Sequence, residues 1–343
     1  MPSLAQESVS VQVKVSVVGL GKMGLLHAGI VNSLPGAAVT SVCEKDLFLS
    51  TAAKAALPKN IVVYRDLSKM ISEEQSDAVF VTTPIDTHVS IVEDLLKLDA
   101  NLNLFVEKPL ASSHEQARIA CEATQGSRGV HMVGFQKRFS PVFQKAQELL
   151  KDTVQAPIFF RAYCLSSDVL REGSAWRSKK GSGGVLLDAA PHLLDILIWF
   201  FGEPTSVMAV KKQVYSHEVE DYVHAVLSFE SGLRGHVDAC WSVSNYRLPE
   251  FLLEIHGRNG VLIVTDDFVK FSPGKQTGGN GGSQMYYRQS FRTPVPFLLT
   301  DPEYTLEDVA FLDSIRTRTT PETNFVQAAK VNALIDRILN NAE

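Results

Sequence analysis

Short apolar runs alternate with amphipathic stretches through the first 134 residues. The apolar runs are rich in Val, Ile and Phe and predict strands at about residues 14–18, 38–43, 61–64, 78–81, 102–106 and 131–134. The stretches between them repeat apolar residues at helical spacing and predict helices that begin near residues 22, 47, 67, 87 and 113. Strands that alternate with helices indicate a parallel sheet covered on both faces. We therefore predict an α/β domain whose ligands bind at the carboxyl ends of the strands.

The pattern changes after about residue 140. One helix is predicted at residues 142–151 and an apolar helix at 189–201, where Gly202 ends it. Extended runs follow one another, at residues 158–163, 206–214, 222–229, 233–243, 251–256 and 261–265. Consecutive strands joined by glycine turns predict a mostly antiparallel, open sheet. Two closing helices, at 306–316 and 325–340, complete a second domain of the α+β class.

Length and composition agree with two globular domains. The chain has 343 residues, of which 45% are hydrophobic and 21% charged, as is ordinary for a globular protein. The first ten residues carry neither the basic stretch nor the apolar core of a signal peptide. We therefore expect a disordered tail at residues 1–10, a parallel-sheet domain at 11–136 and the α+β domain at 137–343.

Charge and cysteine usage exclude several classes of protein. A formal net charge of −5, without a basic run, argues against a surface that binds nucleic acid. The longest apolar run, residues 193–201, contains Asp195 and is too short to cross a bilayer. The four cysteines form no C-x-x-C pair, and no set of His, Cys, Asp and Glu has metal-ligand spacing. We expect reduced thiols, no metal and a cytoplasmic location.

Three glycines follow the first predicted strand with the spacing G-x-G-x-x-G, at Gly19, Gly21 and Gly24. The first permits a tight turn, the second lets a pyrophosphate approach the backbone, and the third lets the helix lie close to the strand. The unpaired N–H groups and the dipole at the start of that helix attract phosphates. This turn therefore predicts a dinucleotide-binding domain of the Rossmann type.

An acidic residue follows at the distance that such a domain requires. Glu44 ends the second predicted strand, where a carboxylate can accept hydrogen bonds from the adenosine ribose. The alternative is a glycine-rich turn beside a solvated Glu. Because Glu44 would repel a 2′-phosphate, we expect NAD to be favoured. Lys22 and Lys45 could bind a phosphate, so NADP remains open.

Lys108 follows the fifth predicted strand, in Glu107-Lys108-Pro109. At the carboxyl end of a central strand, a Lys can reach both a nicotinamide and a substrate hydroxyl. The alternative is a surface Lys paired with Glu107.

Asp188 and His192 open the apolar helix of the second domain. Residues four apart share a helix face, so the carboxylate and the imidazole are predicted to be neighbours. The alternatives are an N-cap for Asp188 and a half-buried histidine for His192, with Asp195 as its partner. A cleft between the two domains would then hold Lys108 and His192 around one substrate.

Taken together, these motifs resemble the glucose–fructose oxidoreductase / inositol dehydrogenase / rhizopine-catabolism (Gfo/Idh/MocA) family over nearly the whole chain. The resemblance rests on the glycine turn with His27, on Thr82-Thr83-Pro84 with His88, on Glu107-Lys108-Pro109, on residues 134–139 and on the helix motif at 183–195. Two positions depart from the family pattern: Ala190 stands where a Gly is usual, and Glu44 where an Asp is usual. Neither change removes a functional group.

The resemblance implies a role for each matched residue. Catalysis would use Lys108, Asp188 and His192, and substrate contacts would add Arg138, Trp176 and Arg177. The implied cofactor site comprises Gly19, Gly21, Lys22, Met23, Gly24, Glu44, Thr82, Thr83, Pro84, His88, Glu107 and Lys108. The implied reaction is hydride transfer between NAD(P) and a secondary hydroxyl or ketone of a sugar, an inositol or a sugar derivative. His192 would be the base and Lys108 would stabilise the alkoxide.

Two other functions fit the same motifs. One is an NAD-dependent glycosidase or epimerase in which hydride transfer is transient, and the other is a non-catalytic dinucleotide-binding protein. For the assembly, one face of the antiparallel sheet needs a cover. We therefore expect a homodimer or homotetramer through the strands between residues 206 and 265, as members of the family it resembles often form.

Overall fold

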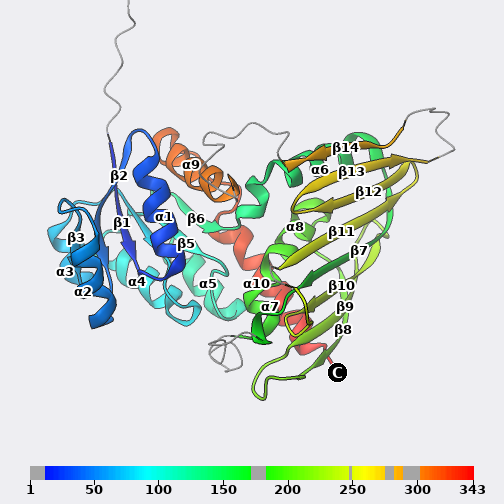
Figure 1. The fold of residues 1–343 in the computed structure, drawn as a ribbon, viewed down its shortest axis with the longest axis horizontal. Helices are drawn as coiled ribbons and strands as arrows, with labels where there is room; N and C mark the ends of the chain where they lie inside the picture. Colours follow the sequence, from blue (N-terminus) through cyan, green and yellow to red (C-terminus); the bar gives the residue numbers. More distant parts are fainter. Residues whose placement is uncertain (1–11, 171–182, 247–248, 275–281, 289–301) are drawn as a thin grey trace, which may run out of the picture. The chain divides into compact units, whose positions relative to one another are not determined.

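The computed structural model describes residues 12–170, 183–246, 249–274, 282–288 and 302–343 (Figure 1). The tail expected at residues 1–10, and both Trp176 and Arg177, lie outside the described residues. The chain forms two compact units. The first comprises Met1–Glu107, Ala120–Gly134 and Glu307–Asn324, and the second comprises Lys108–Ile119, Phe135–Leu306 and Phe325–Glu343.

The first unit contains a parallel sheet of six strands, in the order β3-β2-β1-β4-β5-β6. Its strands are β1 (Val13–Val18), β2 (Ala37–Cys43), β3 (Val62–Tyr64), β4 (Ala78–Val81), β5 (Asn103–Glu107) and β6 (His131–Gly134). Every residue of β4 is buried, as an apolar run covered on both faces requires. The order reverses between β1 and β4, and such a switch point opens a crevice at the carboxyl ends of the strands. The predicted parallel sheet is confirmed.

The helices of this part of the chain are α1 (Lys22–Ser33), α2 (Leu47–Ala56), α3 (Leu67–Glu73), the 3-10 helix η1 (Ile85–Thr87), α4 (His88–Leu98), α5 (His114–Ala123) and α9 (Pro302–Thr317). Two of them begin at aspartate caps: Asp46 accepts from the N–H of Leu49 at 2.8 Å, and Asp66 from that of Lys69 at 2.7 Å. The division between the units passes within α5 and α9.

The second unit contains a sheet of eight strands, in the order β14-β13-β12-β11-β7-β10-β9-β8. They are β7 (Pro157–Leu165), β8 (Ser206–Lys212), β9 (Tyr222–Ser228), β10 (Arg234–Cys240), β11 (Glu250–Gly257), β12 (Gly260–Thr265), β13 (Phe268–Pro273) and β14 (Gln284–Tyr287). Adjacent strands pair antiparallel, except that β7 and β10 run parallel. The mostly antiparallel sheet is confirmed, and it extends beyond the prediction by β13 and β14.

Helices pack against one face of this sheet (Figure 1). They are α6 (Pro141–Leu149), α7 (Gly184–Asp188), α8 (Pro191–Phe201) and α10 (Phe325–Asn340), with shorter turns at η2 (Gln136–Phe139), η3 (Leu150–Val154) and η4 (Asp168–Leu170). The strands alternate accordingly: in β7, Phe160, Ala162 and Cys164 are buried, while Phe159 and Arg161 point outward and are exposed. Across the described parts of the chain, no helix is both long and apolar enough to traverse a bilayer.

Candidate active site

The turn between β1 and α1 has the geometry that the three glycines predict. Gly19 adopts φ +91°, in the left-handed region. A Cβ on Gly24 would lie 2.0 Å from the carbonyl oxygen of Gly19, so only glycine allows this contact. Above Gly21 no atom lies within 4 Å of a built Cβ, and no side chain caps the start of α1. The first N–H groups of α1 are therefore open to an anion, and the turn fits a pyrophosphate.

Glu44 lies at the same edge of the sheet as this turn. Its Oε2 accepts from the N–H of Leu20 at 2.8 Å, and its Oε1 accepts from that of Asp46 at 2.9 Å. These bonds fix the carboxylate against the glycine turn. Each carboxylate oxygen has a second lone pair, which can receive a ribose hydroxyl. Glu44 therefore fits the adenosine end of a dinucleotide.

The motif Thr82-Thr83-Pro84 after β4 contacts the glycine turn between β1 and α1. Thr82 donates its hydroxyl to the carbonyl oxygens of Val18 at 3.0 Å and Gly19 at 2.8 Å. His88 is buried, and its Nε2 lies 2.9 Å from the carbonyl oxygen of Thr83. These contacts hold the shape of the glycine turn. Direct contact of Thr82, Thr83, Pro84 and His88 with the cofactor stays a prediction, as it does for Lys22 and Met23 in the first turn of α1.

We expect Gly24→Ala to lower the affinity for NADH by at least about tenfold, because the new methyl group displaces the Gly19 carbonyl and the turn around it. Gly29→Ala is a matched control in the same helix, since no atom lies within 4 Å of its built Cβ. That change should keep NADH binding and stabilise α1 by up to about 1 kcal/mol. A fluorescence titration with NADH, with melting temperatures alongside, measures both. Parental affinity in Gly24→Ala would contradict this account of the turn.

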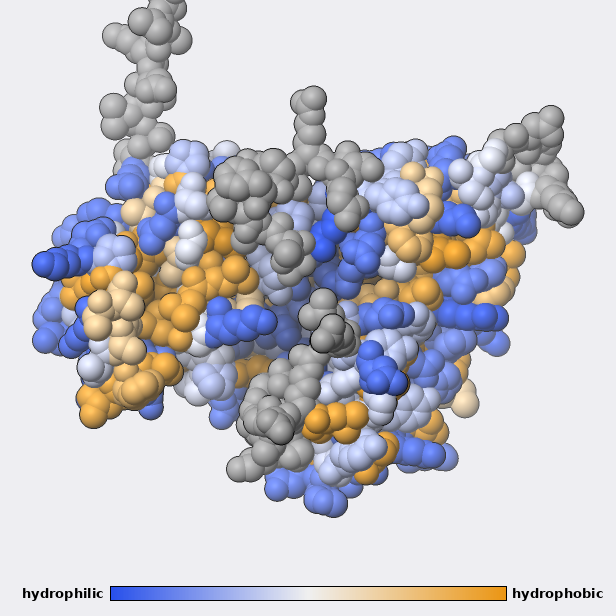
Figure 2. All heavy atoms as spheres, viewed as in Figure 1, coloured by the Kyte–Doolittle hydropathy of each residue, from blue (hydrophilic) through white to orange (hydrophobic). Residues whose placement is uncertain are grey.

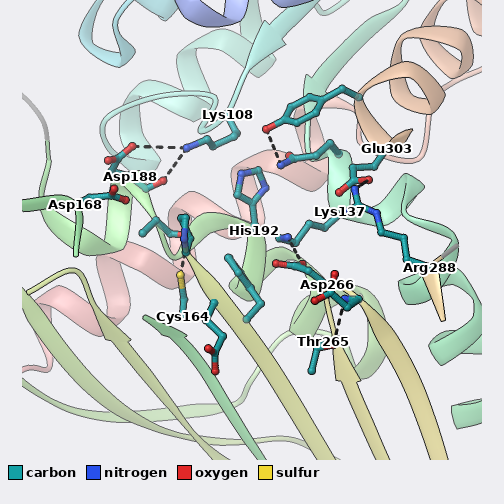
Figure 3. A pocket seen from close by; sticks show the side chains of 17 residues that line it. Lys108, Lys137, Cys164, Asp168, Asp188, His192, Thr265, Asp266, Arg288 and Glu303 are labelled. Atoms are coloured by element: carbon teal, nitrogen blue, oxygen red, sulfur yellow. Dashed lines mark hydrogen bonds and ion pairs between the residues drawn. The ribbon is translucent and has the colours of Figure 1, made fainter. Parts of the chain in front are cut away.

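Lys108, Asp188 and His192 line one pocket, of about 520 Å³, within the second unit (Figure 3). The Nζ of Lys108 donates to the backbone oxygen of Asp188 at 2.7 Å and lies 3.7 Å from its Oδ1. Lys108 thus contacts Asp188. It belongs to the second unit, although it directly follows β5 of the first.

The local structure around Asp188 differs from the prediction. Asp188 is the last residue of α7, and α8 begins at Pro191, so Asp188 and His192 do not share one helix face. The turn at Ala189 and Ala190 brings both side chains to the pocket instead. The prediction of a shared helix face was wrong because the apolar residues of α7 and α8 follow one another closely, and the break between the two helices leaves no clear signal in the sequence.

A glycine sets the position of α7. Gly184 adopts φ +73°, and a Cβ there would lie 2.2 Å from the carboxylate of Glu220. Glu220 uses that space to accept from the N–H of Leu186 at 3.1 Å. The start of α7, and through it Asp188, is therefore held by a carboxylate that is distant in sequence.

His192 is a buried, neutral imidazole at the wall of the pocket. Only 8% of the residue is exposed, and its ring meets those of Phe135 and Phe251 at steep angles. No described residue forms a hydrogen bond with its Nδ1. Burial lowers the pKa of His192 well below 6.5, and the positive charges of Lys108 and Lys137 lower it further. The imidazole is therefore unprotonated at neutral pH and can accept a proton.

Arg138 does not line this pocket. Its Nε and Nη2 donate to the two carboxylate oxygens of Asp195 at 2.7 and 2.6 Å, and both residues are almost fully buried. Asp195 therefore pairs with Arg138 and not with His192. This bidentate pair joins η2 to α8, and the guanidinium also lies over Trp199.

Seven charged residues of the pocket wall were not predicted as site residues: Lys137, Asp168, Glu250, Asp266, Asp267, Arg288 and Glu303. Lys137 forms a short ion pair with Asp266, and its Nζ lies 4.2 Å from the ring centre of Phe251. Arg288 pairs with Glu303 at 2.6 Å. Lys137 directly precedes Arg138 in the motif at 134–139, and this position next to a predicted substrate residue is the signal that could have found it. The other six are spread over distant parts of the chain and form no local pattern.

Cys164 also lines the pocket, but its chemistry is unsuited to nucleophilic attack. Burial raises the pKa of its thiol to about 12. All four cysteines are free thiols.

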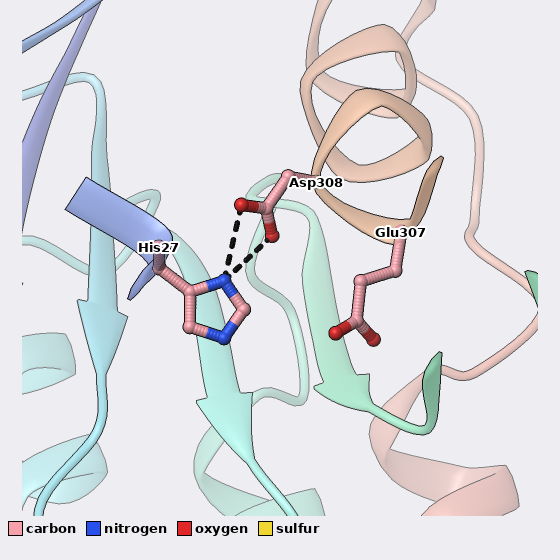
Figure 4. Close-up of side chains that lie close together, drawn as sticks. All are labelled: His27, Glu307 and Asp308. Atoms are coloured by element: carbon pink, nitrogen blue, oxygen red, sulfur yellow. Dashed lines mark hydrogen bonds and ion pairs between the residues drawn. The ribbon is translucent and has the colours of Figure 1, made fainter. Parts of the chain in front are cut away.

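The first unit holds a buried cluster of His27, Glu307 and Asp308, whose possible ligand atoms lie within 4.8 Å of one another (Figure 4). Sequence spacing could not reveal it, because His27 is far from the two acids along the chain. The Nδ1 of His27 lies 2.8 Å from Oδ1 of Asp308, and its Nε2 lies 2.9 Å from Oε1 of Glu107. Both ring nitrogens therefore bond to carboxylates.

The contacts of His27 fit an ion triad with Asp308 and Glu107 better than a metal site. Burial alone would lower the pKa of His27, but Asp308 and Glu107 outweigh it and raise the pKa well above 6.5. Burial also raises the pKa of Asp308 despite the attraction of His27. An imidazolium that donates both N–H groups has no lone pair for a metal ion. The triad instead ties α1 and the end of β5 to α9.

Two family models match this chain. "Oxidoreductase family, NAD-binding Rossmann fold" covers residues 13–135, and "GFO/IDH/MocA C-terminal domain" covers residues 143–263. Together they match parts of both structural units.

Individual relatives agree with these models. The scyllo-inositol 2-dehydrogenase (NAD(+)) of Bacillus subtilis (strain 168) is 29% identical, over 66% of this chain and 67% of that protein. The rhizopine catabolism protein MocA of Rhizobium meliloti is 26% identical, over 76% and 87%. Levoglucosan dehydrogenase, solved in complex with NADH and levoglucosan, superposes with a TM-score of 0.86 at 21% identity, over 96% of this chain and 97% of that one. This last likeness shows the fold.

Proposed function

Because this chain belongs to the Gfo/Idh/MocA family of NAD-binding oxidoreductases, we propose that it transfers a hydride between NAD and a secondary hydroxyl or ketone of a sugar, an inositol or a related polyol. The observation that carries the proposal is the convergence of Lys108, Asp188 and a neutral His192 in one pocket. A protein that only senses a dinucleotide has no need of a proton acceptor beside an ammonium group.

The mechanism assigns one step to each of these side chains. His192 accepts the proton of the substrate hydroxyl, since its imidazole is neutral at neutral pH. Lys108 holds the same oxygen and stabilises the negative charge that develops on it. Asp188 orients Lys108 through their ion pair. A bound NAD would supply the hydride acceptor for this reaction.

The cofactor is held by the first unit. The N–H groups at the start of α1 and the open backbone at Gly21 would receive the pyrophosphate, and Glu44 would accept the ribose hydroxyls.

A dehydrogenase screen tests the function. The purified protein is incubated with NAD and a panel of sugars, inositols and sugar derivatives, and NADH absorbance is followed together with product analysis. Net NADH formation on a polyol supports the proposal. Product formation without net NADH would instead indicate a glycosidase or an epimerase.

We further propose a homo-oligomer that uses the outward face of the second unit's sheet. In the described part of this unit the helices pack on the other face (Figure 1). Apolar side chains remain exposed on the outward face. Met208 of β8 is 70% exposed and pairs with Val226 of β9, while Val210 is 41% and Phe159 37% exposed. A second copy would cover these side chains.

Met208→Asp should therefore shift the protein toward smaller species, because it places a charge in the covered face. Val326→Asp is the control, since Val326 is an exposed apolar residue of helix α10 and not of a strand of the sheet. Light scattering at micromolar concentration measures the mass of each. A parent protein that is already monomeric would refute the oligomer.

We also propose a cytoplasmic location, because four reduced thiols and an NAD-linked reaction suit a reducing compartment that holds NAD. Cell fractionation tests this, and recovery of the protein outside the cytoplasm would contradict it.

A further inference from the structure

The cations of the pocket are each paired with a carboxylate of the same wall. Lys108 pairs with Asp188, Lys137 with Asp266, and Arg288 with Glu303. Figure 3 shows Lys108 and Asp188 on one side of His192, and the other two pairs on the opposite side. A bound ligand therefore meets balanced ion pairs and no cation that lacks an acidic neighbour among the described lining residues.

Further carboxylates line the same pocket. Glu250 and Asp267 are exposed at its wall. Glu250 accepts from the hydroxyl of Tyr163 at 2.7 Å, a neutral donor that leaves its negative charge in place. Asp168 is another acidic lining residue. In the described residues, the wall of the pocket is thus more acidic than basic.

From this charge pattern we infer that the pocket selects uncharged or amino-bearing polyols and rejects anionic ones, such as sugar acids and sugar phosphates. The inference rests on the proposed function, and it adds the charge class of the substrate. The inference concerns the side of the pocket that lies across His192 from Lys108, where the non-reacting part of the substrate would bind.

Hydroxyl groups suit this wall. A carboxylate can only accept hydrogen bonds, and each hydroxyl of a polyol brings one donor. Bonds from hydroxyls to charged acceptors are stronger than those between neutral groups. Glu250, Asp266, Asp267 and Glu303 therefore offer acceptors for several hydroxyls at once, while an ammonium group would gain from the same charges.

An anionic group meets the opposite conditions. It would have to displace a carboxylate from Lys137 or Arg288, and it would leave that carboxylate without its ion pair. It would also add a negative charge near Glu250 and Asp267. Repulsive contacts of this kind give a binding site its selectivity against the wrong ligand.

Binding to the NADH-loaded protein tests the inference independently of turnover. We would titrate myo-inositol, D-glucose, D-glucosamine, D-glucuronate and inositol monophosphate, and compare affinities by calorimetry. The expected result is that at least one neutral or amino compound binds at least about tenfold more tightly than its anionic counterpart, since one unfavourable charge is worth at least that factor. Equal or tighter binding of glucuronate or inositol monophosphate would overturn the inference, and so would binding of none of the compounds.

Substitutions of the carboxylates in the pocket wall test which of them cause the charge selectivity. The double change Glu250→Gln and Asp267→Asn removes two charges and keeps the size of both side chains, so it should narrow the gap between glucose and glucuronate by at least about threefold. Glu254→Gln, on the same strand but outside the pocket, should leave the gap unchanged. An unchanged gap in the double variant would contradict the assignment to these carboxylates.

The outcome separates this inference from the proposed function. Net NADH formation on glucuronate in preference to glucose would keep the hydride-transfer function and refute the charge selectivity. A preference for neutral ligands without any NADH formation would keep the selectivity and refute the function.

Discussion

His192→Asn should lower kcat for polyol oxidation by at least about 10²-fold at neutral pH, the scale expected for one lost proton acceptor. The imidazole is positioned by two aromatic rings and a buried wall, so Asn fills part of its space but cannot take the proton. Binding of NADH should change little, because the dinucleotide is held by the first unit. Steady-state kinetics and an NADH titration measure the two effects.

The pH profile adds a readout that a purely structural His192 would not change. The base works only when unprotonated, and its pKa lies well below 6.5, so oxidation in the parent protein should remain active as the pH falls past 6.5 and decline only at lower pH. Lys137→Met removes one of the positive charges that lower this pKa. Its decline should therefore begin at a higher pH than in the parent protein.

His236→Asn provides a matched control for His192→Asn. His236 lies on the outward side of β10, away from the pocket, so this change should leave kcat unchanged. Full activity in His192→Asn would remove His192 from the mechanism.

Lys108→Met should also reduce kcat by at least about 10²-fold, because the charge developing on the substrate oxygen loses its stabilising cation. Methionine keeps much of the length and volume of the side chain. The Lys108–Asp188 ion pair is partly exposed, with side-chain exposures of 19% and 23%, and its loss should cost at most about 1 kcal/mol of stability. A large loss of turnover with a nearly unchanged melting temperature is therefore the expected signature.

Lys69→Met is the control for this variant, since Lys69 forms an exposed pair with Glu73 on α3, outside the pocket. It should behave as the parent protein in turnover and cofactor binding. Near-normal kcat in Lys108→Met would remove Lys108 from the mechanism.

Elements with strong local signals could be predicted from the sequence. The strands at 78–81 and 131–134 and the helix at 325–340 have the predicted bounds, and the helix predicted near residue 47 begins at Leu47. Apolar runs and capping residues stand directly at the ends of these elements. The prediction of one helix at 189–201 was less accurate. Gly184 starts an additional short helix through its contact with Glu220, and a contact between residues so far apart leaves no local pattern.

The candidate site likewise has residues that the sequence identifies and contacts that only the fold reveals. Residue spacing identified the glycine turn with Glu44, and family motifs pointed to Lys108, Asp188 and His192, since each is carried by a short stretch of chain. Their shared pocket, and the pairing of Arg138 with Asp195, emerge only from the fold.

The sequence by itself therefore determined the two classes of sheet and the glycine turn, because periodicity and glycine spacing are local properties. It also indicated the residues proposed for catalysis, because short motifs that resemble those of the family carry them. Only the tertiary structure decided that His27 pairs with Asp308, that Lys137 and Asp266 line the pocket of His192, and that His192 is neutral. These facts depend on burial and on charges brought together from distant parts of the chain, and neither can be read from neighbouring residues.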